Sequence, residues 1–92
     1  MTHSNKPVTK VLIDYEEKQS LVAFATTLET IAKKLKEDGA FHFVQGEQTI
    51  PIIPGEMVEG EFKYEVKGDK HSFEIELEWY EGVHAKQSMK IE

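Results

Sequence analysis

The chain has 92 residues, of which 39% are hydrophobic and 30% are charged, which is typical of a soluble globular protein with one domain. It contains no cysteine, which excludes disulfides, thiolate nucleophiles and zinc or iron–sulfur sites with thiolate ligands. Since no apolar run approaches the roughly 20 residues of a membrane span, we expect no membrane partner.

The net charge of −6 is concentrated in one segment. Residues 56–81 hold nine acidic residues and three lysines, and the charges in the rest of the chain cancel. An acidic surface repels phosphate backbones, so we expect no nucleic-acid partner. The first residues, MTHSNKPVTK, lack the apolar core of a secretory signal. We therefore predict a flexible lead-in over residues 1–9, a single domain over residues 10–92 and a cytoplasmic location.

Two elements are predicted in the first half of the chain. Residues 11–16, VLIDYE, alternate with the period of a strand. A helix is predicted over residues 21–37, with Ser20 as its N-cap and Gly39 at its C-terminal end. Its apolar residues recur at spacings of three and four, which gives one apolar stripe: Leu21, Phe24, Ala25, Leu28, Ile31, Ala32 and Leu35.

The next segments indicate a hairpin. FHFVQ and TIPII are separated by Gly46 and Glu47, which suit a tight turn. Pro51 and Pro54 lack an amide donor, so TIPII is predicted to be an edge strand.

A second hairpin is predicted around Gly68 and Asp69. Phe62, Tyr64 and Val66 share one strand face, and FEIELEWY places Phe73, Ile75, Leu77 and Trp79 on one face of the next strand. Both apolar sets lie on the same side of the sheet if the residue numbers of directly opposed residues add up to an odd number. A two-residue turn at Gly68 and Asp69 gives the sum 137. On the other face, Glu59 then lies opposite Glu78 and Glu61 opposite Glu76.

The C-terminal HAKQSMKIE also alternates, and a loop at Glu81-Gly82-Val83 would add a further strand. In that register Lys86 faces Glu78 and Lys90 faces Glu74, which leaves Glu59, Glu61 and Glu76 as the least compensated acids.

LVAFATTLETIAKKL, QTIPIIP and FEIELEW together resemble the amphi-Trp domain, a small prokaryotic domain named for an amphipathic strand that leads into a tryptophan. The resemblance covers about residues 13–80. It implies a fold but supplies no activity, cofactor or catalytic residue.

No arrangement of residues indicates catalysis or metal binding. Trp79 falls on the same alternate positions as Phe73, Ile75 and Leu77, so it is predicted on the side of its strand that faces the core. Core packing explains it better than ligand contact. His3, His42, His71 and His84 lack the spacing of a metal site. No hydroxyl has a histidine base placed near it. We therefore predict a protein that is not an enzyme, with no cofactor and no metal.

The predicted partner-binding residues are Glu59, Glu61, Glu76 and Glu78. These residues would dock a basic protein segment, although a sheet face kept charged for solubility also explains them. A weak calcium site is a third reading, but no DxDxDG loop supports it.

We predict an α+β fold in which one helix packs on one face of a largely antiparallel sheet, in the order β-α-β-β-β-β with a further C-terminal strand as an option. The predicted function is a non-catalytic protein-interaction module that uses the acidic sheet face or a sheet edge to bind a protein partner or itself. The alternative is a small-molecule binder with a cleft between helix and sheet, lined by Phe24, Phe41, Phe43 and Tyr64.

Overall fold

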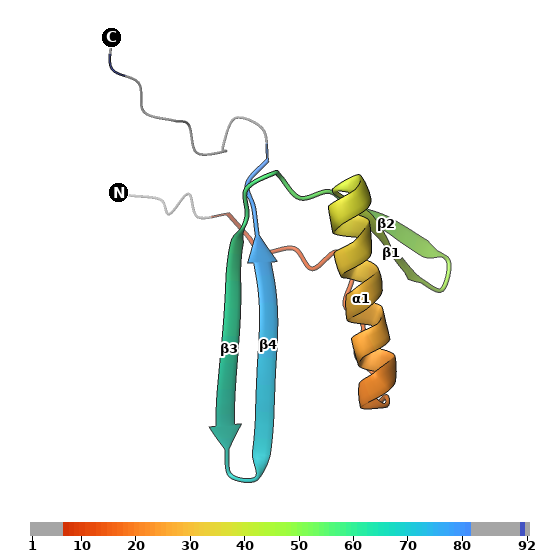
Figure 1. Ribbon diagram of the computed structural model, residues 1–92, viewed down its shortest axis with the longest axis vertical. Helices are drawn as coiled ribbons and strands as arrows, with labels where there is room; N and C mark the ends of the chain where they lie inside the picture. Colours follow the sequence, from red (N-terminus) through yellow and green to blue (C-terminus); the bar gives the residue numbers. More distant parts are fainter. Residues whose placement is uncertain (1–6, 82–90, 92) are drawn as a thin grey trace.

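The computed structural model describes residues 7–81 and residue 91. One helix is followed by four strands: α1 (Leu21–Asp38), β1 (Phe41–Gln45), β2 (Gln48–Ile52), β3 (Glu59–Lys67) and β4 (Lys70–Glu78) (Figure 1). The strands form two antiparallel pairs, β1 with β2 and β3 with β4. The predicted α+β class is confirmed.

Helix α1 begins and ends at the predicted caps. The Ser20 hydroxyl accepts a hydrogen bond of 3.0 Å from the Ala23 amide in the first turn. At the other end, Gly39 has φ 68° and donates its N–H to the Leu35 carbonyl at 3.1 Å. The helix runs one residue beyond the predicted 21–37. Within the described residues, no helix is long and apolar enough to cross a membrane.

Both hairpins turn through a glycine with a positive φ. Gly46 (φ 59°) lies between the paired residues Gln45 and Gln48, and Gly68 (φ 62°) lies between Lys67 and Lys70. In each turn only the first of the two central residues has a positive φ, which matches a type II′ turn. Any side chain at these two positions would strain the backbone.

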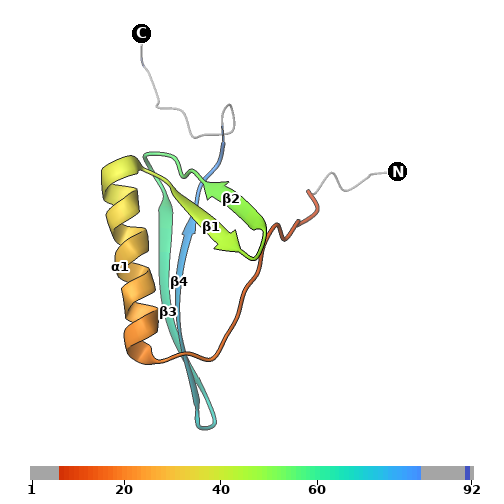
Figure 2. The same cartoon turned by 90° about the vertical axis from the view of Figure 1, so that its right-hand side faces the viewer.

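The C-terminal end of α1 lies close to the start of β1 (Figure 2). Leu28, Ile31 and Leu35 on α1 are half-buried, as are Phe41 and Phe43 on β1. Because Phe41 pairs with Ile52 and Phe43 with Ile50, the half-buried residues of β1 and β2 share one face. No described residue is fully buried, so this contact is the nearest equivalent of a core in the described part of the chain.

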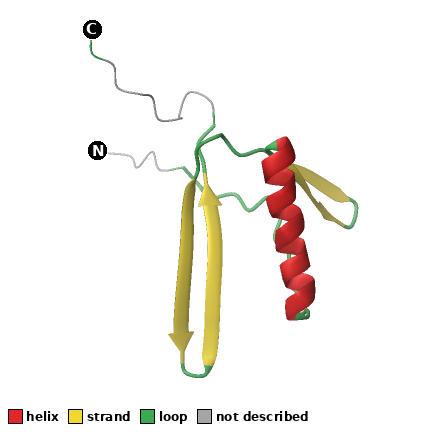
Figure 3. Cartoon of the chain, viewed as in Figure 1, coloured by secondary structure: helices red, strands yellow, loops and turns green. Residues whose placement is uncertain are grey.

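Two details of the predicted architecture differ from the structure. Residues 11–16 are irregular instead of forming a strand (Figure 3). Both sheets are two-stranded and neither includes this segment, so its alternating residues have no partner for backbone hydrogen bonds.

The predicted antiparallel strands are divided between two sheets. The β3–β4 hairpin forms its own sheet, and no Cα of α1 lies within 8 Å of a Cα in β3 or β4. The optional C-terminal strand lies outside the described residues except at Ile91, which is irregular and exposed.

Candidate functional site

The β3–β4 hairpin has two chemically different faces. Tyr64 lies opposite Phe73 and Phe62 opposite Ile75, which confirms the predicted register. Because directly opposed residues point to the same side of a sheet, the aromatic and aliphatic residues of both strands share one face. Every residue of β3 is exposed, and only Ser72 and Leu77 of β4 are half-buried.

The opposite face carries a cluster of carboxylates, here called the acidic patch: Glu59, Glu61, Glu76 and Glu78. Glu59 pairs with Glu78 and Glu61 with Glu76, and all four residues are exposed. The structure therefore brings together the four predicted partner-binding residues at the end of the hairpin away from the Gly68 turn. The predicted compensation by Lys86 and Lys90 involves residues outside the described part of the chain.

The carboxylates of the acidic patch influence one another. A hydrogen bond with Glu78, together with the negative charge of Glu78, raises the pKa of Glu76. One proton held between two carboxyl groups reduces their mutual repulsion. Glu76 therefore holds a proton more tightly than an isolated glutamate at the surface does.

Lys63 marks the boundary of the acidic patch toward the turn. Its Nζ lies 3.3 Å from Oε1 of Glu65 and 3.5 Å from Oε2 of Glu74. The hydrogen bond and charge of Glu65, with the charge of Glu74, raise the pKa of Lys63. These carboxylates have a cation beside them on the same face, whereas Glu59, Glu61, Glu76 and Glu78 form no ion pair with a described residue.

The described histidines form no metal site. His42 is exposed on β1, whereas His71 on β4 bonds through Nδ1 to the Tyr64 hydroxyl. Within residues 7–81, no group of three or more histidine, aspartate or glutamate residues is placed to hold a metal ion. His3 and His84 lie outside the described residues.

Trp79 does not occupy the predicted core position. Its side chain is 36% exposed, and it lines an open depression of about 340 Å³ together with Leu77, Glu78 and Tyr80. Trp79 directly follows the end of β4, and no Cα of the helix that was expected to cover it lies within 8 Å of a Cα in β3 or β4. A side chain on the apolar side of a strand is buried only where another element packs over it.

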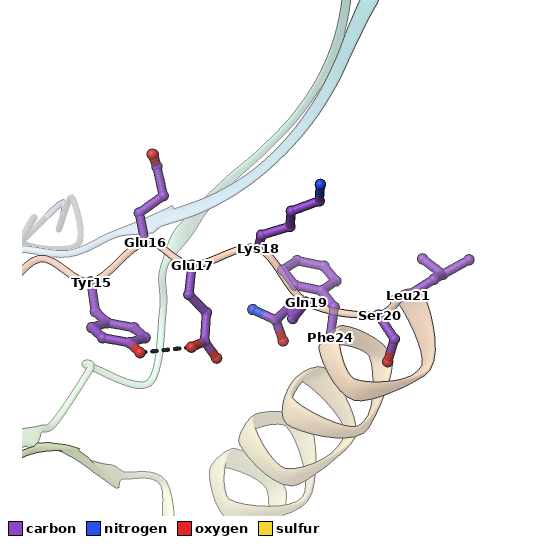
Figure 4. Close-up of a pocket in the computed structure, with 8 residues that line it drawn as sticks. All are labelled: Tyr15, Glu16, Glu17, Lys18, Gln19, Ser20, Leu21 and Phe24. Atoms are coloured by element: carbon purple, nitrogen blue, oxygen red, sulfur yellow. Dashed lines mark hydrogen bonds between the residues drawn. The ribbon is translucent and has the colours of Figure 1, made fainter.

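A second depression, of about 550 Å³, adjoins the start of α1 (Figure 4). It is lined by residues 15–21 and Phe24. The Tyr15 hydroxyl donates a hydrogen bond of 2.7 Å to Glu17, and this bond and the charge of Glu17 raise the pKa of Tyr15. The sequence analysis did not predict this depression, because EKQS is a polar stretch with no recognisable pattern. The only residue that could have indicated it is the N-cap Ser20, since residues 15–19 precede the cap beside the first helical turn.

The predicted cleft aromatics are spread over different elements. Phe24 lines the depression at the start of α1, and Phe41 and Phe43 lie on β1. Tyr64 lies on β3 and forms a pair with His71.

Sequence comparison matches the Amphi-Trp domain over residues 6–92, which extends the predicted resemblance at both ends. Neither the comparison with curated proteins nor the comparison with solved structures gave a match.

Proposed function

This chain belongs to the Amphi-Trp domain family, and we propose that it is a non-catalytic protein-interaction module of the cytoplasm. The family match does not indicate an activity, so the proposal rests on the geometry of the chain's own residues. The single observation that supports this proposal is the acidic patch. Four exposed carboxylates occupy two directly opposed pairs on neighbouring strands.

The arrangement of the acidic patch is costly for an isolated hairpin. Like charges placed directly opposite each other destabilise a strand pair, and here two such pairs are adjacent. The hydrogen bond with Glu78 and the negative charge of Glu78 also raise the pKa of Glu76 along the same strand. A bound cationic group would relieve this repulsion, so the patch contributes binding free energy to a basic partner.

We propose that the partner is a protein segment rich in lysine or arginine. On an exposed patch, complementary charge mainly accelerates association and selects partners by sign. Since the Debye length is about 8 Å at physiological ionic strength and shorter at higher salt, the interaction weakens as salt is added. The patch lies on two directly paired strands, so a short extended basic segment is sufficient to reach all four carboxylates.

The test compares two variants of equal net charge. The patch variant carries Glu→Gln at positions 59, 61, 76 and 78, and the control variant carries Glu→Gln at positions 16, 29, 37 and 47, outside the β3–β4 hairpin. Each is used to capture proteins from a lysate of the source cell at low and moderate salt. Captured proteins are identified by mass spectrometry, and their basic segments are then titrated as synthetic peptides.

The expected result is a protein that wild type and the control variant capture in a salt-sensitive manner and that the patch variant loses. Its basic segment should bind wild type on its own. If the patch variant and the control variant capture the same proteins, or if no basic peptide binds, the acidic patch is only a charged, solvated face and this function is wrong.

A small-molecule binder remains the second candidate because of the open depression beside Phe24. An apolar ligand there would raise the thermal unfolding temperature of wild type in proportion to ligand concentration. Phe24→Ala would remove this shift, whereas the fourfold patch variant would keep it.

A further inference from the structure

The face of the β3–β4 hairpin opposite the acidic patch is apolar and open to solvent. This apolar face consists of Phe62, Tyr64, Val66, Phe73, Ile75 and Leu77, and the name includes Trp79, which directly follows the end of β4. The exposed fractions are 71% for Phe62, 62% for Tyr64, 55% for Val66, 63% for Phe73, 50% for Ile75 and 36% for Trp79, and Leu77 is half-buried.

The apolar face has the size of a protein interface. With about 200 Å² for a fully exposed aromatic side chain, these fractions correspond to on the order of 600 Å² of exposed apolar surface. The largest apolar patch of a typical monomer is about 300–600 Å². Each partner in an interface of standard size contributes about 800 Å². The apolar face therefore lies at the upper limit for a monomer and close to what one partner of a stable complex contributes.

No other described helix or strand covers the apolar face. Helix α1 lies against β1, with no Cα within 8 Å of β3 or β4. Residues 1–6, 82–90 and 92 bring only four apolar side chains, which are Met1, Val83, Ala85 and Met89. These four are smaller in total than the seven residues to be covered, six of which are bulkier than valine and four of which are aromatic.

We propose that a second copy of this chain covers the apolar face. The two hairpins pack face to face about a two-fold axis, so that each apolar face buries the other. The separation is about 10 Å, as between the sheets of a sandwich. Phe62 and Ile75, which are directly opposed near the middle of the hairpin, lie in the centre of this interface.

The charge distribution favours this arrangement over pairing at the strand edges. Each copy carries a net charge of −6, concentrated over residues 56–81. Edge-to-edge pairing would extend the sheet, align the acidic patches of both copies and leave the apolar faces in water. Face-to-face packing places the two patches on opposite outer surfaces, where water and salt screen them. This dimer goes beyond the proposed function, because it uses the other face of the hairpin and leaves both acidic patches free.

The test is the mass in solution of wild type and two lysine variants, measured by sedimentation over a range of concentrations. Phe62→Lys places a charge on the apolar face, and Glu61→Lys places the same side chain one residue away on the acidic face. We expect wild type to sediment as a dimer. The Phe62→Lys variant should dissociate with a dimer Kd raised roughly a hundredfold, as for a buried aromatic hot spot, whereas Glu61→Lys should stay within a few-fold of wild type.

Far-UV circular dichroism of each variant establishes whether it is folded, and Trp79 provides a second readout. Trp79 is the only tryptophan, and burial of its exposed part in the dimer shifts its emission to shorter wavelength. Dilution of wild type should return the emission to longer wavelength at the concentration where the mass halves. If Phe62→Lys does not fold, this wild-type dilution series decides the question alone.

Three outcomes would overturn the proposal. In the first, wild type sediments with the mass of one chain up to millimolar concentration. In the second, the Phe62→Lys variant folds and still forms the dimer. In the third, the Trp79 emission does not change when the dimer dissociates. Each of these outcomes is independent of the acidic patch. A monomer that still captures a basic partner through the patch would refute the dimer and leave the proposed function intact.

Discussion

The Tyr64 hydroxyl lies 2.5 Å from Nδ1 of His71, and the two rings stack with centroids 5.8 Å apart at an interplanar angle of 22°. The pair is diagonal across β3 and β4, because Tyr64 lies opposite Phe73 and His71 opposite Val66. It joins the strands close to the turn, where Lys67 and Lys70 place like charges opposite each other. Stacking and a hydrogen bond thus stabilise the end of the hairpin that like charge weakens.

Tyr64→Phe should separate the hydrogen bond from the stacking. The ring remains, but the hydroxyl that bonds to His71 is lost. We expect the free energy of unfolding to fall by about 0.5 kcal/mol, at the low end for a hydrogen bond because the site is exposed to water. Urea titration measures the change. Tyr80→Phe is the control, since Tyr80 forms no hydrogen bond with a described residue; equal losses in both variants would show that the Tyr64–His71 bond does not stabilise the hairpin.

The pKa of Glu76 leads to a prediction about pH. Its pKa is raised above 4.5 in the folded chain by the hydrogen bond and charge of Glu78, so the folded state binds this proton more tightly than the unfolded state does. The resulting stability is fully present below the unfolded pKa and is lost as the pH rises through the folded pKa. We expect Glu76→Gln to unfold at a higher urea concentration than wild type at neutral pH, because glutamine carries no charge.

The advantage of Glu76→Gln should shrink as the pH falls through the range in which carboxyl groups titrate, since wild type then carries a neutral side chain too. Glu47→Gln removes the same charge at the β1–β2 turn, away from the acidic patch. It should not reproduce the advantage at neutral pH. Unfolding curves of wild type and Glu76→Gln that keep a constant separation at every pH would contradict this prediction.

Ile31→Ala tests the contact between α1 and β1. Ile31 is half-buried on the apolar stripe of α1, and β1 is the only described strand with Cα atoms within 8 Å of those of the helix, so truncation of Ile31 should weaken this packing. We expect a loss of about 1–2 kcal/mol in the free energy of unfolding, less than the 2–5 kcal/mol typical of fully buried positions. The matched control is Val22→Ala, which shortens a side chain that is 75% exposed in the same helix.

Chemical unfolding should place Val22→Ala within about 0.5 kcal/mol of wild type. Alanine is also the stronger helix former, so any small change should favour that variant. If Ile31→Ala is as stable as Val22→Ala, the helix does not depend on β1 for its position.

The elements that the sequence predicted are those whose determinants lie close together along the chain. Ser20 and Gly39 mark the ends of α1 within one or two residues of its bounds, since capping depends on side-chain and backbone groups of a single turn. The β3–β4 register followed from Gly68 and the alternation of Phe62, Tyr64, Phe73 and Ile75. The acidic patch was predicted with it, because a register determines which residues share a face.

The strand predicted over residues 11–16 shows where local patterning fails. VLIDYE has the alternation of a half-buried strand, but its backbone groups require a neighbouring strand that the described structure does not supply. The depression beside Phe24 was missed for a similar reason. It is formed by the course of an irregular segment past the first turn of α1, and no residue pattern specifies that course.

By itself, the sequence determined the ends of the helix, the two hairpins, the register of β3 with β4 and the separation of acidic from apolar residues on that hairpin. These features depend on hydrogen bonds and contacts between residues that are near neighbours or joined by a two-residue turn. Only the tertiary structure decided that α1 lies near β1, that the strands form two separate sheets, and that Trp79 is partly exposed. Burial of an apolar stripe against any apolar surface lowers the free energy of the folded protein. Amphipathic patterning therefore predicts which face is favoured to be buried, but it does not specify which element packs against that face.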